Sequence, residues 1–97
     1  MRVIGTEIIE EYGKLHKDVD GRLSSWLEVA KRSSWKHSVD VTSQNPNAGP
    51  IGKNRVVFDI KGNKYRLIVR INYEIGLVVI RWVGTHSEYN KINAHTI

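Results

Sequence analysis

The chain has 97 residues, of which 40% are hydrophobic and 26% charged, as expected for one globular domain with a modest core. It has no cysteine, which excludes disulfide bonds and thiolate metal sites, and no apolar run approaches the roughly 20 residues needed to span a membrane. No signal peptide is recognisable, so the sequence predicts a cytoplasmic protein.

The positive charge is concentrated in the second half of the chain. Residues 51–97 hold eight Lys or Arg and three Asp or Glu, which accounts for the whole net charge of +5, because residues 1–50 hold seven of each kind. A localised basic surface indicates a polyanionic partner, most often nucleic acid. Ordinary solubilising charge is the alternative.

The first third of the chain predicts a short strand over 1–5 and two helices. The first helix is expected over 6–18 with Thr6 as its cap, and the second over 20–32 with Asp20 as its cap. Because little chain separates them, we expect an antiparallel helical hairpin. The apolar stripes expected to face the core are Ile8, Tyr12 and Leu15 in the first helix and Leu23, Trp26, Leu27 and Ala30 in the second.

Residues 33–54 show no sustained period and are rich in Ser, Asn, Gly and Pro, so we expect mainly loop. A connection of this length is unusual in a compact domain and is often functional. We expect Trp35 to anchor this segment in the core rather than to stack on a nucleic-acid base.

From residue 55 onward the hydrophobic period becomes two, which predicts three antiparallel strands over 55–60, 64–73 and 77–83. The tail after the third strand has no strand pattern, and we expect a loop or a short helix there.

The predicted turns determine which residues of neighbouring strands face each other. A turn at Gly62-Asn63 pairs Phe58 with Leu67, Val56 with Val69, Asp59 with Arg66, and Arg55 with Arg70. A turn at Ile75-Gly76 pairs Ile71 with Ile80, Val69 with Trp82, and Arg70 with Arg81. This register is favoured because it keeps the apolar residues of all three strands on one face. A bulge in place of the second turn is the alternative, because Ile is a poor first residue for a tight turn.

The same register predicts a row of three arginines, Arg55–Arg70–Arg81, across the other face. Like charges directly opposite one another disfavour strand pairing by a few tenths to ~1 kcal/mol, so a row of three arginines indicates a role other than stabilising the sheet. We interpret it as a phosphate-binding face, since guanidinium groups bind phosphate through two parallel hydrogen bonds. In the alternative, the arginine stems lie along the neighbouring apolar side chains while their heads extend into water.

The sequence contains no P-loop and no dinucleotide fingerprint, and its four histidines lack metal-ligand spacing, so we expect neither a cofactor nor a metal. His86 is the histidine best placed for acid–base chemistry, because it follows the last strand and precedes Tyr89 by three residues. With Arg66 they could cleave RNA without metal. The ribose 2′-OH would attack phosphorus, His or Tyr would move protons, and Arg would stabilise the developing charge.

Each of these three residues also has a plainer interpretation. His86 alone is more often an exposed or structural residue, Tyr89 a packing residue, and Arg66 the ion-pair partner of Asp59.

The sequence resembles a known family in two segments, "FDIKGNKYRLIVRINY" and "IRWVGTHSEYNKI", and upstream in "LSSWLEVAKRSSWKHSVDV". Together they resemble the HigB-type toxins of bacterial type II toxin–antitoxin systems, part of the RelE-like group of messenger-RNA-cleaving toxins. The resemblance covers nearly the whole chain. It implies a single α+β domain over 1–97, with two N-terminal helices packed on one face of a small antiparallel sheet.

The resemblance also implies an activity and partners. The activity would be metal-independent cleavage of messenger RNA, usually on the translating ribosome. The partner would be a HigA-like helix-turn-helix antitoxin, which neutralises the toxin and represses the shared operon, so that the toxin meets DNA only through the antitoxin.

By position, the resemblance assigns catalysis to Arg66, His86 and Tyr89. Arg66 in "YRL" matches the RelE-like arginine that contacts the scissile phosphate. His86 in "VGTH" falls where many relatives carry a second catalytic arginine, and Tyr89 lies near the C-terminal catalytic tyrosine. The basic residues expected to bind RNA are Lys53, Arg55, Lys61, Lys64, Arg70 and Arg81.

One departure from the family pattern keeps alternatives open. RelE-like toxins often carry catalytic lysines on the strand before the hairpin, where this chain has Val57 and Asp59. Lys61, Lys64 or Arg55 would then supply that charge from other positions. The alternatives are a non-catalytic or degenerate RNA-binding module that retains antitoxin binding, and a structural interaction protein without RNA affinity.

Overall fold

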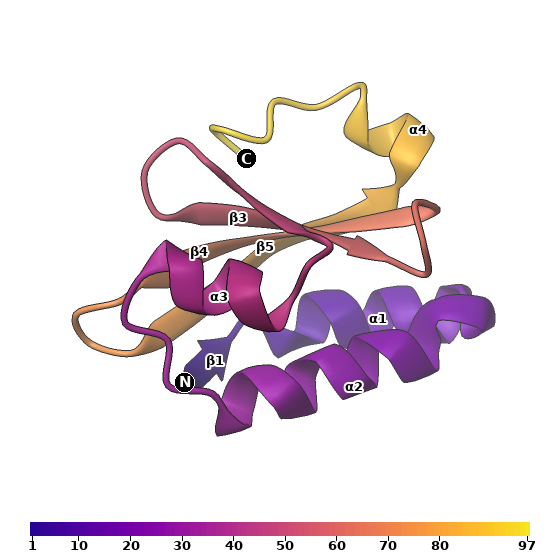
Figure 1. Cartoon of the computed structure of the whole chain (residues 1–97). Coiled ribbons are helices and arrows are strands. Elements are labelled where there is room, and N and C mark those ends of the chain that lie inside the picture. Colours follow the sequence, from indigo (N-terminus) through magenta and orange to yellow (C-terminus); the bar gives the residue numbers. More distant parts are fainter.

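The computed structural model describes all 97 residues and contains five strands and four helices. The elements in chain order are β1 (Arg2–Ile4), α1 (Thr6–Leu15), α2 (Lys17–Arg32), α3 (Ser38–Gln44), β2 (Ala48–Ile51), β3 (Arg55–Ile60), β4 (Tyr65–Asn72), β5 (Leu77–Thr85) and α4 (His86–Tyr89). The strands form one sheet in the order β1-β5-β4-β3-β2, in which only β1 and β5 are parallel. Helices α1 and α2 lie on one side of this sheet (Figure 1). The predicted α+β fold is confirmed.

The helices differ from prediction where they meet. Helix α1 ends at Leu15 and α2 already begins at Lys17, so Asp20 lies inside α2 and is not its cap. Asp18 and Asp20 stand in the first turn of α2, where an acidic residue is favoured by the helix dipole much as a cap is. The N-cap of α1 is Gly5 rather than Thr6. Its φ of 83° and the close approach of the Ile80 carbonyl, 2.8 Å from where a Cβ would stand, require glycine.

The core lies between these two helices and the sheet. Leu23, Trp26 and Ala30 are buried as predicted. In α1 the fully buried apolar side chain is Ile9, Ile8 and Tyr12 pack partly buried against the core, and Leu15 is 80% exposed. Trp35 is only 2% exposed and its ring stacks near that of Phe58, which confirms the predicted anchor. The seventeen core residues are Ile9, Val19, Leu23, Trp26, Ala30, Trp35, Val41, Val56, Phe58, Ile60, Tyr65, Leu67, Val69, Ile71, Val78, Ile80 and Val83.

The prediction of a mainly irregular segment over 33–54 was wrong, because this segment contains α3 and β2. Helix α3 is rich in Ser, Thr and Val, which are poor helix formers. The Asp40 carboxylate accepts hydrogen bonds from the backbone N–H groups of Lys36 (2.8 Å) and His37 (3.1 Å), which lowers the pKa of Asp40 and closes the first turn. Strand β2 contains Pro50, which is tolerated because β2 lies at the edge of the sheet.

The first hairpin has the predicted register. Phe58 faces Leu67, Asp59 faces Arg66, and Arg55 faces Arg70.

The second hairpin differs from prediction. Its turn has four residues between the paired Asn72 and Leu77, where two were expected, so Arg70 faces Val79 and not Arg81. A β-bulge then leaves Arg81 without a partner and pairs Trp82 with Ile68. Consequently Trp82 lies outside the core cluster that we expected it to join, and Val83 enters it instead. Simple alternation cannot reveal such an extra residue.

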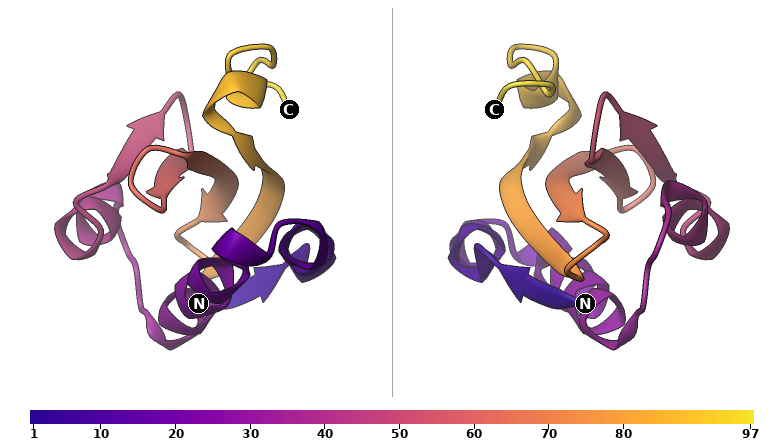
Figure 2. Two further views of the ribbon diagram at one scale, coloured as in Figure 1. Left: turned by 90° about the vertical axis from the view of Figure 1, so that its right-hand side faces the viewer. Right: turned by 90° about the vertical axis from the view of Figure 1, so that its left-hand side faces the viewer.

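The face of the sheet opposite α1 and α2, called here the second face, is covered by the C-terminal segment. After α4, residues 90–97 return across this face (Figure 1), on the side of the sheet away from α1 and α2 (Figure 2), in agreement with the predicted loop or short helix. Ala94 is buried against Val57 and Ile68. Other side chains that pack on this small cluster are Ile51, Trp82, Tyr89, Ile92 and Ile97. No helix of the fold is both long and apolar enough to cross a bilayer.

Candidate functional site

Arg66 on β4 is held on the second face by three neighbours. Its Nε lies 3.2 Å from Oδ1 of Asp59, the residue opposite on β3, although the N–H is not aligned for a hydrogen bond. Its Nη2 donates to Oδ1 of Asn63 at 3.3 Å. The guanidinium carbon stands 4.6 Å from the ring centre of Tyr89, a cation–π contact. The Nη1 group has no protein acceptor and is free to bind an anion.

Tyr89 reaches Arg66 because α4 begins as soon as β5 ends. The Glu88 N–H donates to Oγ1 of Thr85 (3.1 Å), and the Thr85 N–H donates to Oε1 of Glu88 (2.8 Å), which forms a capping box. The bond from the Thr85 N–H also lowers the pKa of Glu88. The sequence signal for this turn is the T-x-x-E spacing of Thr85 and Glu88, which sequence reasoning did not use.

Helix α4 is also tied to α1. The Tyr12 hydroxyl lies 3.4 Å from Oε1 of Glu88, and burial together with this carboxylate raises the pKa of Tyr12 to about 12. This contact links the element that carries Tyr89 to the helical layer.

Trp82 and Gly84 support the tyrosine from β5. Gly84 faces Arg66 across the sheet, and a Cβ at this position would stand 2.5 Å from the Trp82 ring. Only glycine therefore lets the indole lie over the strand, where its centre is 6.2 Å from the centre of the Tyr89 ring. Sequence reasoning missed this role because it assigned Trp82 to the core.

An open pocket of about 340 Å³ adjoins Arg66 and Tyr89. One wall is the segment 46–51, which includes β2, and the remaining lining residues are Val57, Asp59, Arg66 and Tyr89. Asn47 fixes this wall to β3, because its side-chain amide donates to the Asp59 carbonyl and its own carbonyl accepts from the Asp59 N–H at 3.0 Å. The pocket thus joins a candidate phosphate ligand, an aromatic ring and a wall of small side chains.

His86 does not join this group. Its backbone N–H donates to the Lys64 carbonyl at 3.0 Å, its side chain is half-exposed, and it is not among the residues that line the pocket. Of the three predicted catalytic residues, the structure brings Arg66 and Tyr89 into contact at the lining of one pocket. No group of three or more His, Asp or Glu side chains gathers as a metal site.

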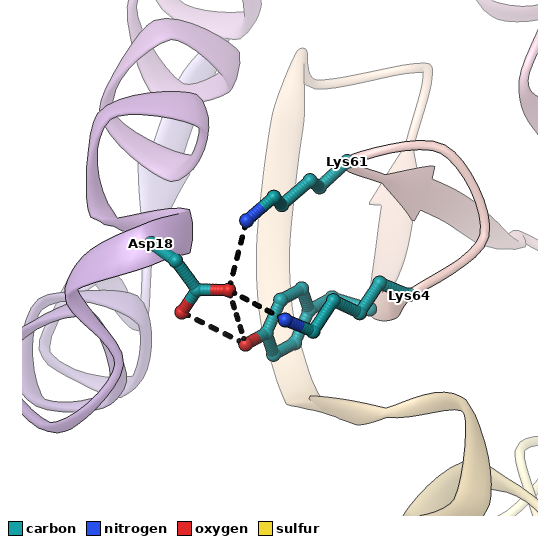
Figure 3. A network of polar contacts seen from close by, with 4 residues as sticks. Asp18, Lys61 and Lys64 are labelled. Atoms are coloured by element: carbon teal, nitrogen blue, oxygen red, sulfur yellow. Dashed lines mark hydrogen bonds and ion pairs between the residues drawn. The ribbon is translucent and has the colours of Figure 1, made fainter.

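Lys61 and Lys64 converge on a carboxylate that sequence reasoning did not single out. Both ammonium groups donate to Oδ2 of Asp18, at 3.0 Å and 2.9 Å, and the Tyr65 hydroxyl donates to the same carboxylate at 2.9 Å (Figure 3). Hydrogen bonds from Lys64 and then Lys61 lower the pKa of Asp18, and the bond to Asp18 raises that of Lys64. The negative charge of α2 therefore offsets part of the basic charge at this turn.

Only part of the predicted arginine row is present, because Arg55 faces Arg70 but Arg81 has no partner on β4. Arg55 and Arg81 instead meet at the C-terminal segment. Arg55 Nη1 donates to the carbonyls of Ile97 (2.7 Å) and Ala94 (3.4 Å), and Arg81 Nε donates to the Ile97 carbonyl at 3.2 Å. Burial, followed by the charges of Arg81 and Arg70, lowers the pKa of Arg55. Arg70 and Lys53 are exposed and bind no protein group. The six predicted RNA-binding residues thus fall into free, Asp18-bound and tail-bound pairs.

Comparison with known proteins identifies the family. The model of HigB_toxin, described as the RelE-like toxic component of a toxin–antitoxin system, matches residues 20–92. No curated protein matches the chain. The matched segment includes Arg66, Tyr89 and all the strands that build the pocket. The chain therefore belongs to the HigB_toxin family, the RelE-like toxins of toxin–antitoxin systems.

Proposed function

We propose that the protein is an endoribonuclease that cuts messenger RNA without a metal, on the translating ribosome. One observation carries the proposal: a half-buried arginine with a free Nη1 group lies against a tyrosine ring at the mouth of an open pocket. Membership of the RelE-like toxin family supports it, since messenger-RNA cleavage is the general activity of that group.

In the proposed reaction the ribose 2′-oxygen attacks the adjacent phosphorus and the bond to the 5′-oxygen breaks. The products are a 2′,3′-cyclic phosphate and a 5′-hydroxyl. Arg66 stabilises the charge that develops on the phosphoryl oxygens, Tyr89 gives a proton to the leaving oxygen, and His86 takes the proton of the 2′-OH. In this proposal the RNA extends beyond the pocket to reach His86, because the imidazole does not line the pocket.

The remaining basic residues would bind the RNA backbone in different ways. Lys53 and Arg70 are free to contact phosphate directly. Lys61 and Lys64 would divide their hydrogen bonds between phosphate and the Asp18 carboxylate. Arg55 and Arg81 would bind RNA only where a phosphate displaces the Ile97 carbonyl as their acceptor.

A toxin of this kind implies an antitoxin partner. We propose a HigA-like antitoxin with a helix-turn-helix domain, through which the pair contacts DNA, and we propose that both act in the cytoplasm.

The proposal is tested with purified ribosomes, a defined message and four variants: Arg66→Ala, His86→Ala, Tyr89→Phe and Arg32→Ala. Arg32 is a matched control because its only side-chain bond is to the Glu28 carbonyl of its own helix. We expect cyclic-phosphate ends with wild type and Arg32→Ala, and strong losses with the other three. Absence of such ends with wild type on ribosomes and on free RNA would overturn the proposal.

A non-catalytic RNA-binding module remains the second candidate. It is favoured by the position of His86 outside the pocket and by Val57 and Asp59 at places where relatives often carry lysines. This candidate predicts RNA binding that strengthens as salt falls, without any cyclic-phosphate product.

A further inference from the structure

The pocket beside Arg66 is open partly because one residue of its wall is a glycine. Gly49 of β2 lies opposite Val57 of β3, and paired residues of neighbouring strands project to the same side. Val57 belongs to the apolar cluster of the second face, so a side chain at position 49 would project into the pocket. A Cβ on Gly49 would meet no atom within 4 Å, and the backbone there is not in the left-handed region. The absence of a side chain at this position therefore creates space and relieves no backbone strain.

The edge that borders this space is kept open. Strand β2 is the last strand of the sheet, so no further strand covers its outer side. Pro50 has no N–H group, which discourages another strand from joining there. The pocket is therefore accessible from the edge of the sheet as well as from the second face.

The lining combines a flat aromatic ring with a few hydrogen-bonding groups. Tyr89 and Val57 provide apolar surface, and the Asp59 carboxylate, 37% exposed, provides an acceptor. The Asn47 amide nitrogen is used by the Asp59 carbonyl, which leaves its side-chain oxygen as a second acceptor. Arg66 stands at the border of the same pocket and can bind a phosphate through Nη1. Phosphate ligand, aromatic surface and acceptors within one pocket match the parts of a single nucleotide.

We propose that this pocket holds one unpaired base of the RNA, next to the phosphate at Arg66, and that Gly49 sets the size of the base that enters. Proteins that read single-stranded RNA splay a base out, stack it on an aromatic or arginine plane and bind its edge. The pocket offers all of these contacts, and its volume of about 340 Å³ lies in the lower range of small-molecule sites. The inference rests on the proposed function, because it assumes that RNA binds at Arg66.

A graded series at position 49 tests the proposal. Gly49→Ala should narrow the pocket and shift cleavage from purines towards pyrimidines at the base beside the cut. Gly49→Leu should fill the pocket and lower kcat/KM for message cleavage at least tenfold. Neither variant should lower the melting temperature by more than a few degrees, since a Cβ at position 49 meets no atom within 4 Å and the pocket beyond it is open. The matched control is Gly21→Leu, because a Cβ on Gly21 of α2 also meets nothing within 4 Å.

Binding provides a readout that does not depend on cleavage. An oligoribonucleotide series with one abasic site at successive positions should bind wild type more weakly when the missing base is the one in the pocket. For Gly49→Leu the abasic and complete oligonucleotides should bind equally. The leucine already keeps the base out of the pocket, so removal of the base costs no further affinity.

The outcomes separate the two proposals. Unchanged cleavage rate and base preference in a folded Gly49→Leu would overturn the pocket assignment and leave the nuclease proposal standing. Binding of RNA by wild type without cleavage, together with the abasic effect, would overturn the nuclease proposal and retain the pocket. An abasic effect of the same size in wild type and Gly49→Leu would overturn the pocket in either case.

Discussion

The two faces of the sheet are covered in different ways. The face under α1 and α2 is closed by seventeen buried apolar residues from every layer of the fold. The second face has a buried cluster of three residues, Val57, Ile68 and Ala94, and arginine-to-carbonyl bonds hold the C-terminal segment beside it. The first arrangement provides most of the apolar burial that stabilises the fold. The arrangement on the second face leaves charged side chains, a pocket and hydrogen bonds that a ligand could replace, all on the rigid sheet.

The largest expected effect is on the core face. Phe58 is 1% exposed and packs between the rings of Trp26 and Trp35, so Phe58→Ala removes buried area and leaves a cavity. We expect a loss of about 3–5 kcal/mol in the free energy of unfolding, measured by urea denaturation. The control is Ile75→Ala, since Ile75 is 65% exposed in a turn and should change stability by less than about 0.5 kcal/mol. A similar loss for both variants would contradict the division between the faces.

Arg66 should show the opposite balance of stability and activity. Its ion pair with Asp59 is partly exposed, so Arg66→Ala should cost only about 1 kcal/mol or less in unfolding. If Arg66 stabilises the transition state, the same substitution should lower cleavage by about 10²–10³-fold. Arg66→Lys keeps the charge but loses the planar fork, and should recover only part of the activity. A variant that unfolds as readily as Phe58→Ala would show that Arg66 is a structural residue.

Arg55 tests how the C-terminal segment is held. Arg55→Met keeps an apolar stem and removes the bonds to Ile97 and Ala94. Hydrogen bonds to charged groups contribute about 1.5–3 kcal/mol, and less where water can replace them, so we expect a loss of about 1–2 kcal/mol. Amide hydrogen exchange should accelerate over residues 92–97 while protection in the core strands stays unchanged. Equal acceleration everywhere would mean that the segment is part of the cooperative core.

The same division explains what could be predicted from the sequence. The period of two and the Gly62-Asn63 turn determined the strands and the first hairpin register, because burial of one face penalises a slip by one residue. The bulge at Arg81 escaped prediction, since one extra residue exchanges the faces of Trp82 and Val83 without altering composition. Strand β2 escaped as well, because Gly49 and Pro50 are disfavoured in strands and leave only Ile51 as a strand-favouring residue among four.

For the candidate site, the sequence predicted which kinds of side chain are present better than it predicted where they lie. It named Arg66 and Tyr89, which lie in contact at one pocket, and His86, which does not line that pocket. The arginine row depended on a two-residue second turn, and the longer turn that is present places Val79 opposite Arg70. Asp18 was missed because it lies 43 residues from Lys61 and 46 from Lys64 along the chain, and no local pattern reports such a contact.

The smallest expected effect concerns Asp18, whose network joins α2 to the turn between β3 and β4 (Figure 3). Hydrogen bonds from Lys64, Lys61 and Tyr65 lower the pKa of this carboxyl below its ordinary value of 3.8. A carboxyl with a lowered pKa in the folded state stabilises the fold fully above its unfolded pKa. That contribution is lost as the pH falls from 3.8 through the folded value.

Asp18→Asn should therefore unfold more readily than wild type at pH 7, and the difference should shrink when both are compared below pH 3.8. Asp40 and Glu88 also have lowered pKa values, but they are present in both proteins and cancel in the difference. Urea denaturation of both proteins across this pH range measures it. A difference that stays constant on acidification would mean that the carboxylate charge contributes nothing. In that case the hydrogen bond from Tyr65 and the shape of the turn would hold this region together without the ion pairs. Lys61 and Lys64 would then be as available to bind phosphate as Arg70 is.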